Sequence, residues 1–304
     1  MRIVSLLPSA TEIVYALGLG DDLAAVTEEC DWPPEADDKP VVSRSALPPG
    51  LASSREIDEA VRERMDTREP LYRVDVDLIR RIEPDVILTQ DLCRVCAVPS
   101  GQVERALEEV GAEQAKVLSL DPHSLEQVLE GILATGRLLG AADQAGELVS
   151  SLRARLDAVR RTAERLPSIR TFALEWLDPP FVGGHWVPDM VRLAGGTNLL
   201  SEPEQPSRAV SWYDVTDANP EVVVFMPCGY DLDAAEVEGA ALLGSPGFSE
   251  LPAARTGNVF AVDATSYFSR PGPRLVDGAE ILAWALHPDA FPEPAAGRVT
   301  RLGG

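Results

Sequence analysis

The sequence predicts an α/β protein of two lobes, each with a parallel sheet, joined by a long helical connector. Short apolar runs alternate with helical patterns over residues 1–120, the alternation resumes after Pro167, and a helical pattern without proline lies between. Strands separated by helices are typical of parallel sheets, because parallel neighbours need a crossover connection. We expect an N-terminal lobe over 1–122, a connecting helix over 123–166 and a C-terminal lobe over 167–304.

In the first lobe, apolar runs predict strands over 2–7, 23–27, 85–90 and 115–120. Helical patterns predict helices over 9–18, 54–66 and 100–111. Ser9 is placed to cap the first helix, with Glu12 three residues on as in a capping box, and Gly18 is placed to end it.

The connector repeats apolar residues at helical spacing from Ser124 to about Leu166. One helix of this length, or two helices joined near Gly140, fits the pattern. A single helix of this length would measure about 60 Å, which is too long for an ordinary crossover in a small sheet, so we expect a spine between two lobes. In the second lobe, strands are expected over 171–176, 221–226 and 258–263, and helices over 187–196 and 275–287.

The composition excludes several classes of function. The chain has 304 residues, 45% of them hydrophobic, and 27 basic against 49 acidic residues give a formal charge of −22. This charge repels phosphate backbones and anionic lipids, so we expect no nucleic-acid partner. No stretch approaches the roughly 20 apolar residues that span a bilayer, so we expect no membrane insertion. We expect a monomer.

The first residues, MRIVSLLPSATEIVYALG, do not have the pattern of a signal peptide, because Pro8, Ser9 and Glu12 interrupt the apolar core. As written, the sequence therefore predicts a cytoplasmic protein. A chain trimmed to a mature start would look the same and would be periplasmic or extracytoplasmic. The four cysteines do not indicate a disulfide scaffold.

The unusual side chains follow the predicted strands. In open parallel sheets ligands bind beyond the carboxyl ends of the strands. Large aromatic residues there can stack on a flat, bulky ligand, although a single loop aromatic more often only covers a strand end. The predicted ligand-binding residues are Ser9, Ala10, Thr11, Cys30, Trp32, Asp91, Cys93, Trp176, Phe181, His185, Trp186, Cys228, Tyr267, Phe268 and Arg270.

No catalytic motif stands out. The three histidines, His123, His185 and His287, do not form an HExxH motif, and no serine lies in GxSxG. GLGDDL at 18–23 and GGTN at 195–198 match neither a dinucleotide-binding nor a P-loop pattern, and their glycines are expected to end helices. We therefore expect no enzymatic activity and no catalytic residues.

Cys93 and Cys96 form a CxxC pair directly after the strand over 85–90. This spacing suits zinc, an iron–sulfur site or a redox dithiol, and packing of two small thiols is the alternative. The pair is weak alone, because structural zinc sites commonly use two such pairs, and Cys30 and Cys228 are isolated. A zinc or iron site, or a thiol-redox function, at Cys93 and Cys96 remains an alternative hypothesis.

Several segments resemble substrate-binding proteins of the vitamin B12 and iron-chelate ABC transporters. They are SLLPSATEIVYALGLGDDLAAVT, IEPDVILTQ, RLAGGTNLL, ANPEVVVF and SRPGPRLVDGAEILAWALHP. The resemblance covers nearly the whole chain and is strongest to cobalamin-binding proteins. It implies two Rossmann-like lobes joined by one rigid helix, a ligand held in the cleft between them and delivery to a membrane permease. ECDWPP and TQDLCRVCAVP resemble a signal-less branch of these proteins.

Such proteins present a carboxylate on each lobe to arginines of the permease. The matching position of the first lobe, seven residues before Pro84, holds Asp77; that of the second, seven before Pro220, holds Tyr213 with Asp214 beside it. The resemblance thus implies permease docking through Asp77 and Asp214.

The resemblance implies that the ligand is cobalamin or a related corrinoid. An iron-siderophore or haem carrier of the same fold is a further hypothesis. An anionic siderophore calls for clustered arginines, and the second-lobe loops offer mainly Arg270 and Arg208, so this alternative ranks lower.

Overall fold

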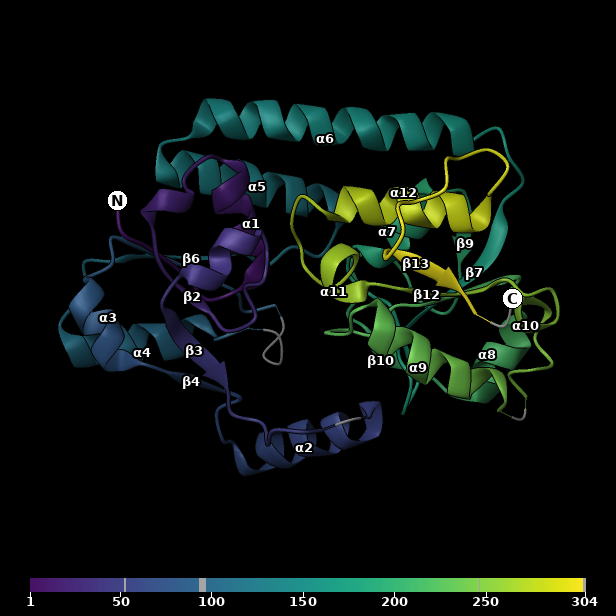
Figure 1. The fold of residues 1–304 in the computed structure, drawn as a ribbon, viewed down its shortest axis with the longest axis horizontal. Coiled ribbons are helices and arrows are strands. Elements are labelled where there is room, and N and C mark those ends of the chain that lie inside the picture. The colour runs from purple at the N-terminus through teal and green to yellow at the C-terminus, as the bar shows by residue number, and fades with distance from the viewer. Residues whose placement is uncertain (52, 93–96, 246, 303–304) are drawn as a thin grey trace. The chain divides into compact units, whose positions relative to one another are not determined.

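The structure is a computed structural model, and it describes residues 1–304 except 52, 93–96, 246, 303 and 304 (Figure 1). The chain divides into two compact units. Unit 1 comprises Met1–Ala52, Glu56–Pro122 and Leu129–Val149, and unit 2 comprises Ser53–Arg55, His123–Val128 and Ser150–Gly304. Among the described helices, none is long and apolar enough to cross a membrane.

Unit 1 is built on a six-stranded sheet in the order β4-β3-β2-β1-β5-β6. Its strands are β1 (Ile3–Ser5), β2 (Leu23–Thr27), β3 (Val41–Ser45), β4 (Tyr72–Val74), β5 (Val86–Thr89) and β6 (Lys116–Ser119). All neighbours pair in parallel except β3 and β4, which are antiparallel. Every residue of β5 is buried, as expected for a central parallel strand covered on both faces.

The helices of unit 1 before the connector are α1 (Pro8–Ala16), α2 (Ser54–Thr67), α3 (Val76–Ile82) and α4 (Ser100–Val110), with short 3-10 turns η1 (Gly20–Asp22) and η2 (Pro34–Asp38). Figure 1 shows α3 and α4 side by side, and their apolar faces pack on the sheet in one core. The predicted capping box is wrong, because α1 begins at Pro8 and places Ser9 inside the helix. Proline is favoured at the first helical position.

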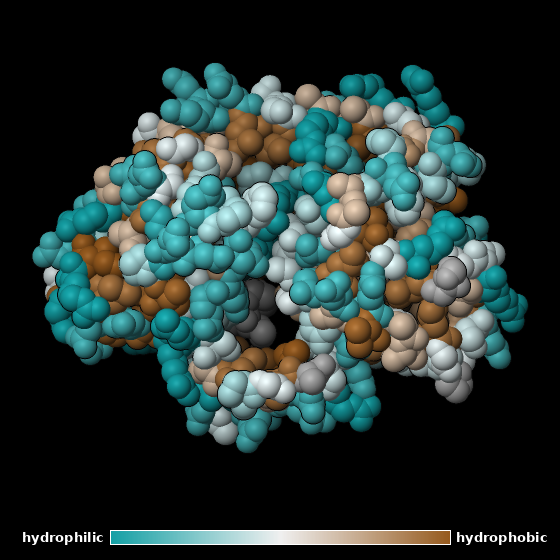
Figure 2. Space-filling model, in the orientation of Figure 1, coloured by the Kyte–Doolittle hydropathy of each residue, from teal (hydrophilic) through white to brown (hydrophobic). Residues whose placement is uncertain are grey.

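The connector contains two helices, α5 (Leu125–Leu139) and α6 (Ala142–Ala163). Gly140 between them has a φ of 76°, a left-handed conformation that favours glycine. The sequence allowed either one long helix or two helices joined near Gly140, and the structure has two helices. The boundary between the two units falls inside α6, between Val149 and Ser150. In Figure 2 hydrophilic residues predominate along α6.

Unit 2 is built on a second sheet in the order β10-β8-β7-β11-β12-β13, with β9 also paired to β7. Its strands are β7 (Ile169–Trp176), β8 (Phe181–Val182), β9 (Gly196–Asn198), β10 (Arg208–Ala209), β11 (Val222–Phe225), β12 (Val259–Val262) and β13 (Val299–Arg301). The strands β7, β11 and β12 form the parallel centre, and β8 and β13 join it antiparallel.

The helices of unit 2 after the connector are α7 (Val187–Leu193), α8 (Trp212–Ala218), α9 (Leu232–Leu243), α10 (Pro252–Arg255), α11 (Ala264–Tyr267) and α12 (Leu275–Leu286). Figure 1 shows α7 and α12 on one side of the sheet and α9 on the other. Phe172, Phe225 and Phe260 are fully buried in unit 2. The predicted fold class, α/β with two sheets and a helical connector, is confirmed.

Candidate functional site

In unit 1 the chain leaves β1 toward β2 on one side and later returns to pair β5 on the other side. The carboxyl ends of β1 and β5 therefore flank a topological switch point, where open α/β sheets bind ligands. Thr11 Oγ1 donates to Ser5 Oγ (2.9 Å), which donates to the carbonyl of Leu7 (3.0 Å). Since this uses the Thr11 proton, the Cys30 thiol is the donor in its 3.0 Å contact with Thr11 Oγ1.

Thr11 and Cys30 are both buried, and they join the loops that follow β1 and β2. Ala10 is also fully buried, and the buried Ser9 Oγ has no hydrogen-bond partner among the described residues. Trp32, in contrast, is 46% exposed. Ligand contacts for Trp32 and for the four buried residues stay a prediction.

Asp91 follows β5 and is exposed. Its carboxylate accepts hydrogen bonds from the backbone N–H of Ser100 (2.9 Å), at the start of α4, and from Ser119 Oγ (3.2 Å). Its own N–H donates to the carboxylate of Asp121 (2.5 Å). Asp91 therefore fastens the loop after β5 to α4 and β6, which a sequence pattern alone does not reveal.

In unit 2 the equivalent switch point lies between β7 and β11. Trp176, the last residue of β7, makes an edge-to-face contact with Tyr230 beyond β11, with ring centroids 5.7 Å apart and planes at 75°. Both rings are partly exposed. The N–H of Cys228 donates to the carbonyl of Glu175 (3.2 Å), which ties the two strand ends together. The structure thus places an aromatic pair and a cysteine at this switch point.

Other predicted aromatic residues have packing contacts. Phe181 lies opposite Trp176 in the antiparallel pairing of β7 and β8. Trp186 is only 6% exposed, and its Nε1 donates to the carbonyl of Phe268 (2.8 Å), which is itself buried. Arg270 is also buried. Trp186 and Phe268 fix the loop after β8 to the loop after α11, and their contact with a ligand stays a prediction.

Tyr267, at the end of α11, is surrounded by cationic groups. The guanidinium carbons of Arg298 and Arg274 lie 5.0 Å and 5.8 Å from the centre of its ring. Such contacts stabilise by about 0.5–2 kcal/mol each, depending on exposure. Burial raises the pKa of the Tyr267 hydroxyl, so the ring is neutral at physiological pH.

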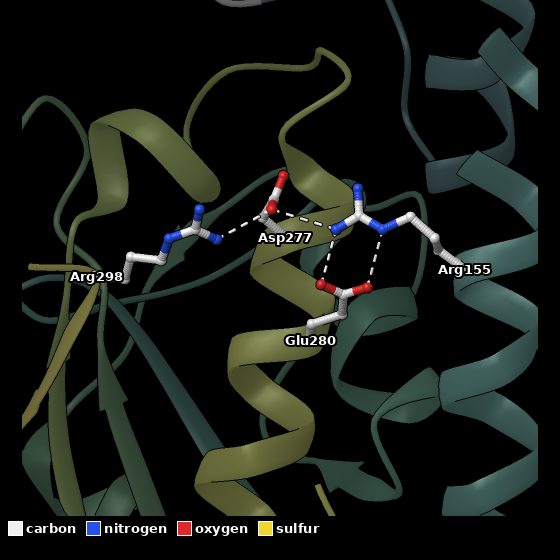
Figure 3. A network of polar contacts seen from close by, with 4 residues as sticks. All are labelled: Arg155, Asp277, Glu280 and Arg298. Carbon is white, nitrogen blue, oxygen red and sulfur yellow. Dashed lines mark hydrogen bonds and ion pairs between the residues drawn. The ribbon is translucent and has the colours of Figure 1, made fainter. Parts of the chain in front are cut away.

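Arg298 is in turn held by a network of ion pairs shown in Figure 3. Asp277 on α12 accepts from Arg298 (3.0 Å) and from Arg155 on α6 (3.2 Å). Arg155 also forms two hydrogen bonds with Glu280 (2.9 and 2.7 Å). The network connects the part of α6 in unit 2 to α12 and, through Arg298, to the Tyr267 ring.

Glu175 is a partly buried residue that the sequence prediction missed. Burial raises its pKa, while a hydrogen bond from Ser207 and one from the Gly184 N–H (3.4 Å) act in the opposite direction. The Gly184 N–H also reaches Ser207 Oγ (3.1 Å). The three groups hold together the end of β7, the loop after β8 and the segment before β10.

The raised pKa of Glu175 predicts a pH-dependent effect of Glu175→Gln. The folded state keeps this proton to a higher pH than the unfolded state, whose pKa is near 4.5. The stability from the group is therefore present below that value and lost as pH rises through the folded pKa. Glutamine keeps an acceptor without the charge, so we expect the variant to gain stability over wild type as pH rises.

Urea unfolding at about pH 5 and about pH 8 tests this expectation. The difference in unfolding free energy between Glu175→Gln and wild type should change with pH by at most about 1.4 kcal/mol per pH unit. A difference in unfolding free energy between Glu175→Gln and wild type that is the same at both pH values would contradict the assignment.

His185 lies directly after this junction and contacts a second histidine. Its ring centroid is 5.6 Å from that of His123 and 5.7 Å from that of Trp186. Burial and the charge of His123 lower the pKa of His185, so its imidazole is neutral at physiological pH. Its Nδ1 is buried with no hydrogen-bond partner among the described residues. His123, outside the predicted binding set, is thus part of this site.

The two predicted docking carboxylates are both exposed. Asp77, in the first turn of α3, forms an ion pair with Arg80. Asp214 forms a capping box at the start of α8, where Ser211 donates from its N–H (3.0 Å) and Oγ (2.7 Å). These bonds lower the pKa of Asp214. Tyr213 beside it is 76% exposed. Docking through these residues stays a prediction.

Cys93 and Cys96 lie outside the described residues, so the structure does not show what surrounds them. Across the part of the chain that the structure describes, no group of three or more His, Cys, Asp or Glu side chains is placed to hold a metal ion. The metal or redox alternative at Cys93 and Cys96 has no support from these residues.

Comparison with known proteins decides the family. Residues 3–265 match the periplasmic binding protein family. This chain belongs to that family. It is 26% identical to the vitamin B12-binding protein of Vibrio cholerae over 282 residues, which cover 92% of this chain and 86% of the relative. The resemblance stated from the sequence motifs is thereby confirmed.

Solved structures of this family have the same fold. The periplasmic vitamin B12 binding protein BtuF of Vibrio cholerae superposes with a TM-score of 0.66 at 25% identity, covering 94% of this chain and 96% of that one. A periplasmic heme binding protein from Pseudomonas aeruginosa has a TM-score of 0.72 at 22% identity, covering 100% and 99%. The likeness to the haem-binding protein concerns the fold alone.

Proposed function

We propose that this periplasmic binding protein binds a corrinoid, a cobalamin-like ligand, without chemical conversion. The observation that carries the proposal is the Trp176–Tyr230 pair at the switch point of unit 2. Partly exposed rings from two adjacent strand ends offer apolar area to a large, flat macrocycle. The relationship to vitamin B12-binding proteins supports this ligand over other flat molecules.

The proposal includes delivery of the ligand to an ABC permease. Asp77 and Asp214 supply one exposed carboxylate on each unit, and each is held by a local partner, Arg80 or Ser211. A preorganised carboxylate loses less side-chain entropy when it pairs with an arginine of the permease. The net charge of −22 favours a cationic docking surface.

Haem is a second candidate ligand, because the neutral His185 imidazole is a suitable iron ligand. An anionic siderophore has less support. Of the two arginines expected to contact one, Arg270 is buried and Arg208 is exposed, so the two do not offer a cluster of exposed arginines.

Titration calorimetry of the full chain with cyanocobalamin, hydroxocobalamin and haemin tests the ligand. We expect a corrinoid Kd in the micromolar range or tighter. Trp176→Ala or Tyr230→Ala should weaken corrinoid binding about tenfold or more. Each variant removes apolar contact area whose burial contributes about 2 kcal/mol to the binding free energy.

Tyr213→Ala is the matched control, since it also removes an exposed aromatic ring of unit 2 but lies in α8 and not in the Trp176–Tyr230 pair. It should leave the Kd unchanged. Absence of heat with both corrinoids at micromolar protein would overturn the proposed function, and binding of haemin alone would replace the corrinoid by haem.

A further inference from the structure

The start of α2 belongs to unit 2, whereas the rest of this helix belongs to unit 1. Ser53–Arg55 fall in unit 2, and the chain on either side, Met1–Ala52 and Glu56–Pro122, falls in unit 1. Every strand of the unit 2 sheet starts at or after Ile169, so this sheet forms without the three residues. Ser53–Arg55 are therefore an addition to unit 2 whose detachment leaves its sheet intact.

Ser54 is held by α9. Its N–H and its Oγ both donate to Glu238 Oε1, at 3.0 and 2.6 Å. Ser54 is only 1% exposed, so water has little access to these bonds. In this position Glu238 Oε2 is buried with no hydrogen-bond partner among the described residues, which costs free energy. That cost offsets part of the stabilisation from the two bonds.

Arg55 is held by the turn between β7 and β8. Its Nε (2.7 Å) and its Nη2 donate to the same carboxylate oxygen, Oδ2 of Asp178. Two parallel bonds, one to each carboxylate oxygen, would be the stronger arrangement. The side chains of Arg55 and Asp178 are 67% and 45% exposed, and exposed ion pairs contribute little because water and salt screen them. This second attachment is therefore weak.

The two attachment points lie in segments that flank the Trp176–Tyr230 pair. Asp178 follows closely after Trp176, the last residue of β7. Glu238 lies on α9, the first helix after Tyr230. The strands β7 and β11 border the switch point of unit 2. Residues 53–55 therefore connect the two segments that leave these strands at the candidate site.

We propose that Ser53–Arg55 act as a strap that controls the passage of the ligand to and from the Trp176–Tyr230 pair. The proposal rests on the proposed function and deepens it, because it regulates the same site. With Ser54 and Arg55 attached, the segments on both sides of the pair are tied together, and a large macrocycle passes slowly. With both detached, it passes freely. Opening a helix end that is held by few and exposed contacts needs little free energy.

A strap of this kind changes rates more than affinity. A strap that closes equally well over the empty and the occupied site slows binding and release by the same factor, so the Kd stays the same. The strength of an exposed ion pair corresponds to a factor of at most about five.

Stopped-flow tryptophan fluorescence of the full chain with cyanocobalamin measures both rates. Arg55→Ala and Glu238→Ala each remove one attachment. We expect association and dissociation to become about two- to fivefold faster in both variants, with the Kd within about twofold of wild type. Arg62→Ala is the matched control. It removes another exposed arginine of α2, whose partner Asp58 lies in the same helix (2.8 Å), and it should keep the wild-type rates.

Wild-type rates in both Arg55→Ala and Glu238→Ala overturn the strap and leave corrinoid binding intact. Slower association with a higher Kd in Arg55→Ala would show that Arg55 contacts the ligand itself, which also overturns the strap.

Amide hydrogen exchange of the free chain tests the strap without a ligand. The Ser54 N–H lies in the first turn of α2, where no acceptor within the helix is in reach, and its acceptor is Glu238. We expect faster exchange of this amide in Arg55→Ala, which leaves Glu238 in place, than in wild type or Arg62→Ala. Failure of corrinoids to bind overturns the proposed function, whereas equal Ser54 exchange in the three proteins overturns the strap.

Discussion

Replacing Gly278 by alanine is expected to destabilise unit 2 by about 3 kcal/mol, the largest effect of a single methyl group that we predict. Gly278 lies within α12, where it packs against α11. A Cβ there would lie 2.1 Å from the carbonyl oxygen of Tyr267 and 2.8 Å from the Met190 terminal methyl. Methionine can move, but a backbone carbonyl cannot, so α12 must separate from α11.

The measurement is the unfolding free energy in urea, supported by a fall in Tm of about 6–12 °C. Gly146→Ala in α6 is the control, because a Cβ on Gly146 meets no atom within 4 Å. That variant should be neutral or more stable by up to about 1 kcal/mol, since alanine is the better helix former. A Gly278→Ala variant as stable as wild type would show that α11 and α12 are not in close contact.

Replacing Gly184 by alanine is expected to destabilise unit 2 by about 2 kcal/mol. The added methyl group would overlap the backbone atoms of Gln205, Pro206 and Ser207, the nearest at 2.2 Å. The loop after β8 must then move away from the segment before β10. The measurement is the unfolding free energy in urea.

Gly244→Ala is the control for this variant, since its Cβ would come only within 3.8 Å of a carbonyl oxygen, that of Ala241. It should be as stable as wild type. A Gly184→Ala variant as stable as wild type would show that the loop after β8 is not in close contact with the segment before β10.

Much of the fold could be predicted because its central strands are apolar on both faces. The strand predicted over 23–27 has the bounds of β2, and that over 85–90 contains β5. The capping of α1 failed, because Pro8 competes with Ser9 for the start of the helix. The short strands β8, β9 and β10 depend on pairing across the sheet, which leaves little local pattern in two or three residues.

The candidate site was harder to predict than the fold. The predicted binding set includes Trp176 but omits its partner Tyr230, and it includes His185 but omits His123. These pairs join residues far apart in sequence. Glu175 follows three apolar residues in β7 and belongs to no motif, and only its surroundings in the structure account for its raised pKa. Tyr230 also lies just past a predicted strand, so the strand-end pattern could have included it, whereas no pattern in the sequence selects Glu175.

The strand order described for the two sheets has a consequence for the order of folding. All six strands of the sheet in unit 1 lie between Ile3 and Ser119, so this sheet needs no strand from later in the chain. The sheet of unit 2 ends with β13 at Val299–Arg301, which pairs with β12. During synthesis the first sheet can therefore assemble on the ribosome, while the edge of the second closes only after residue 301 has emerged.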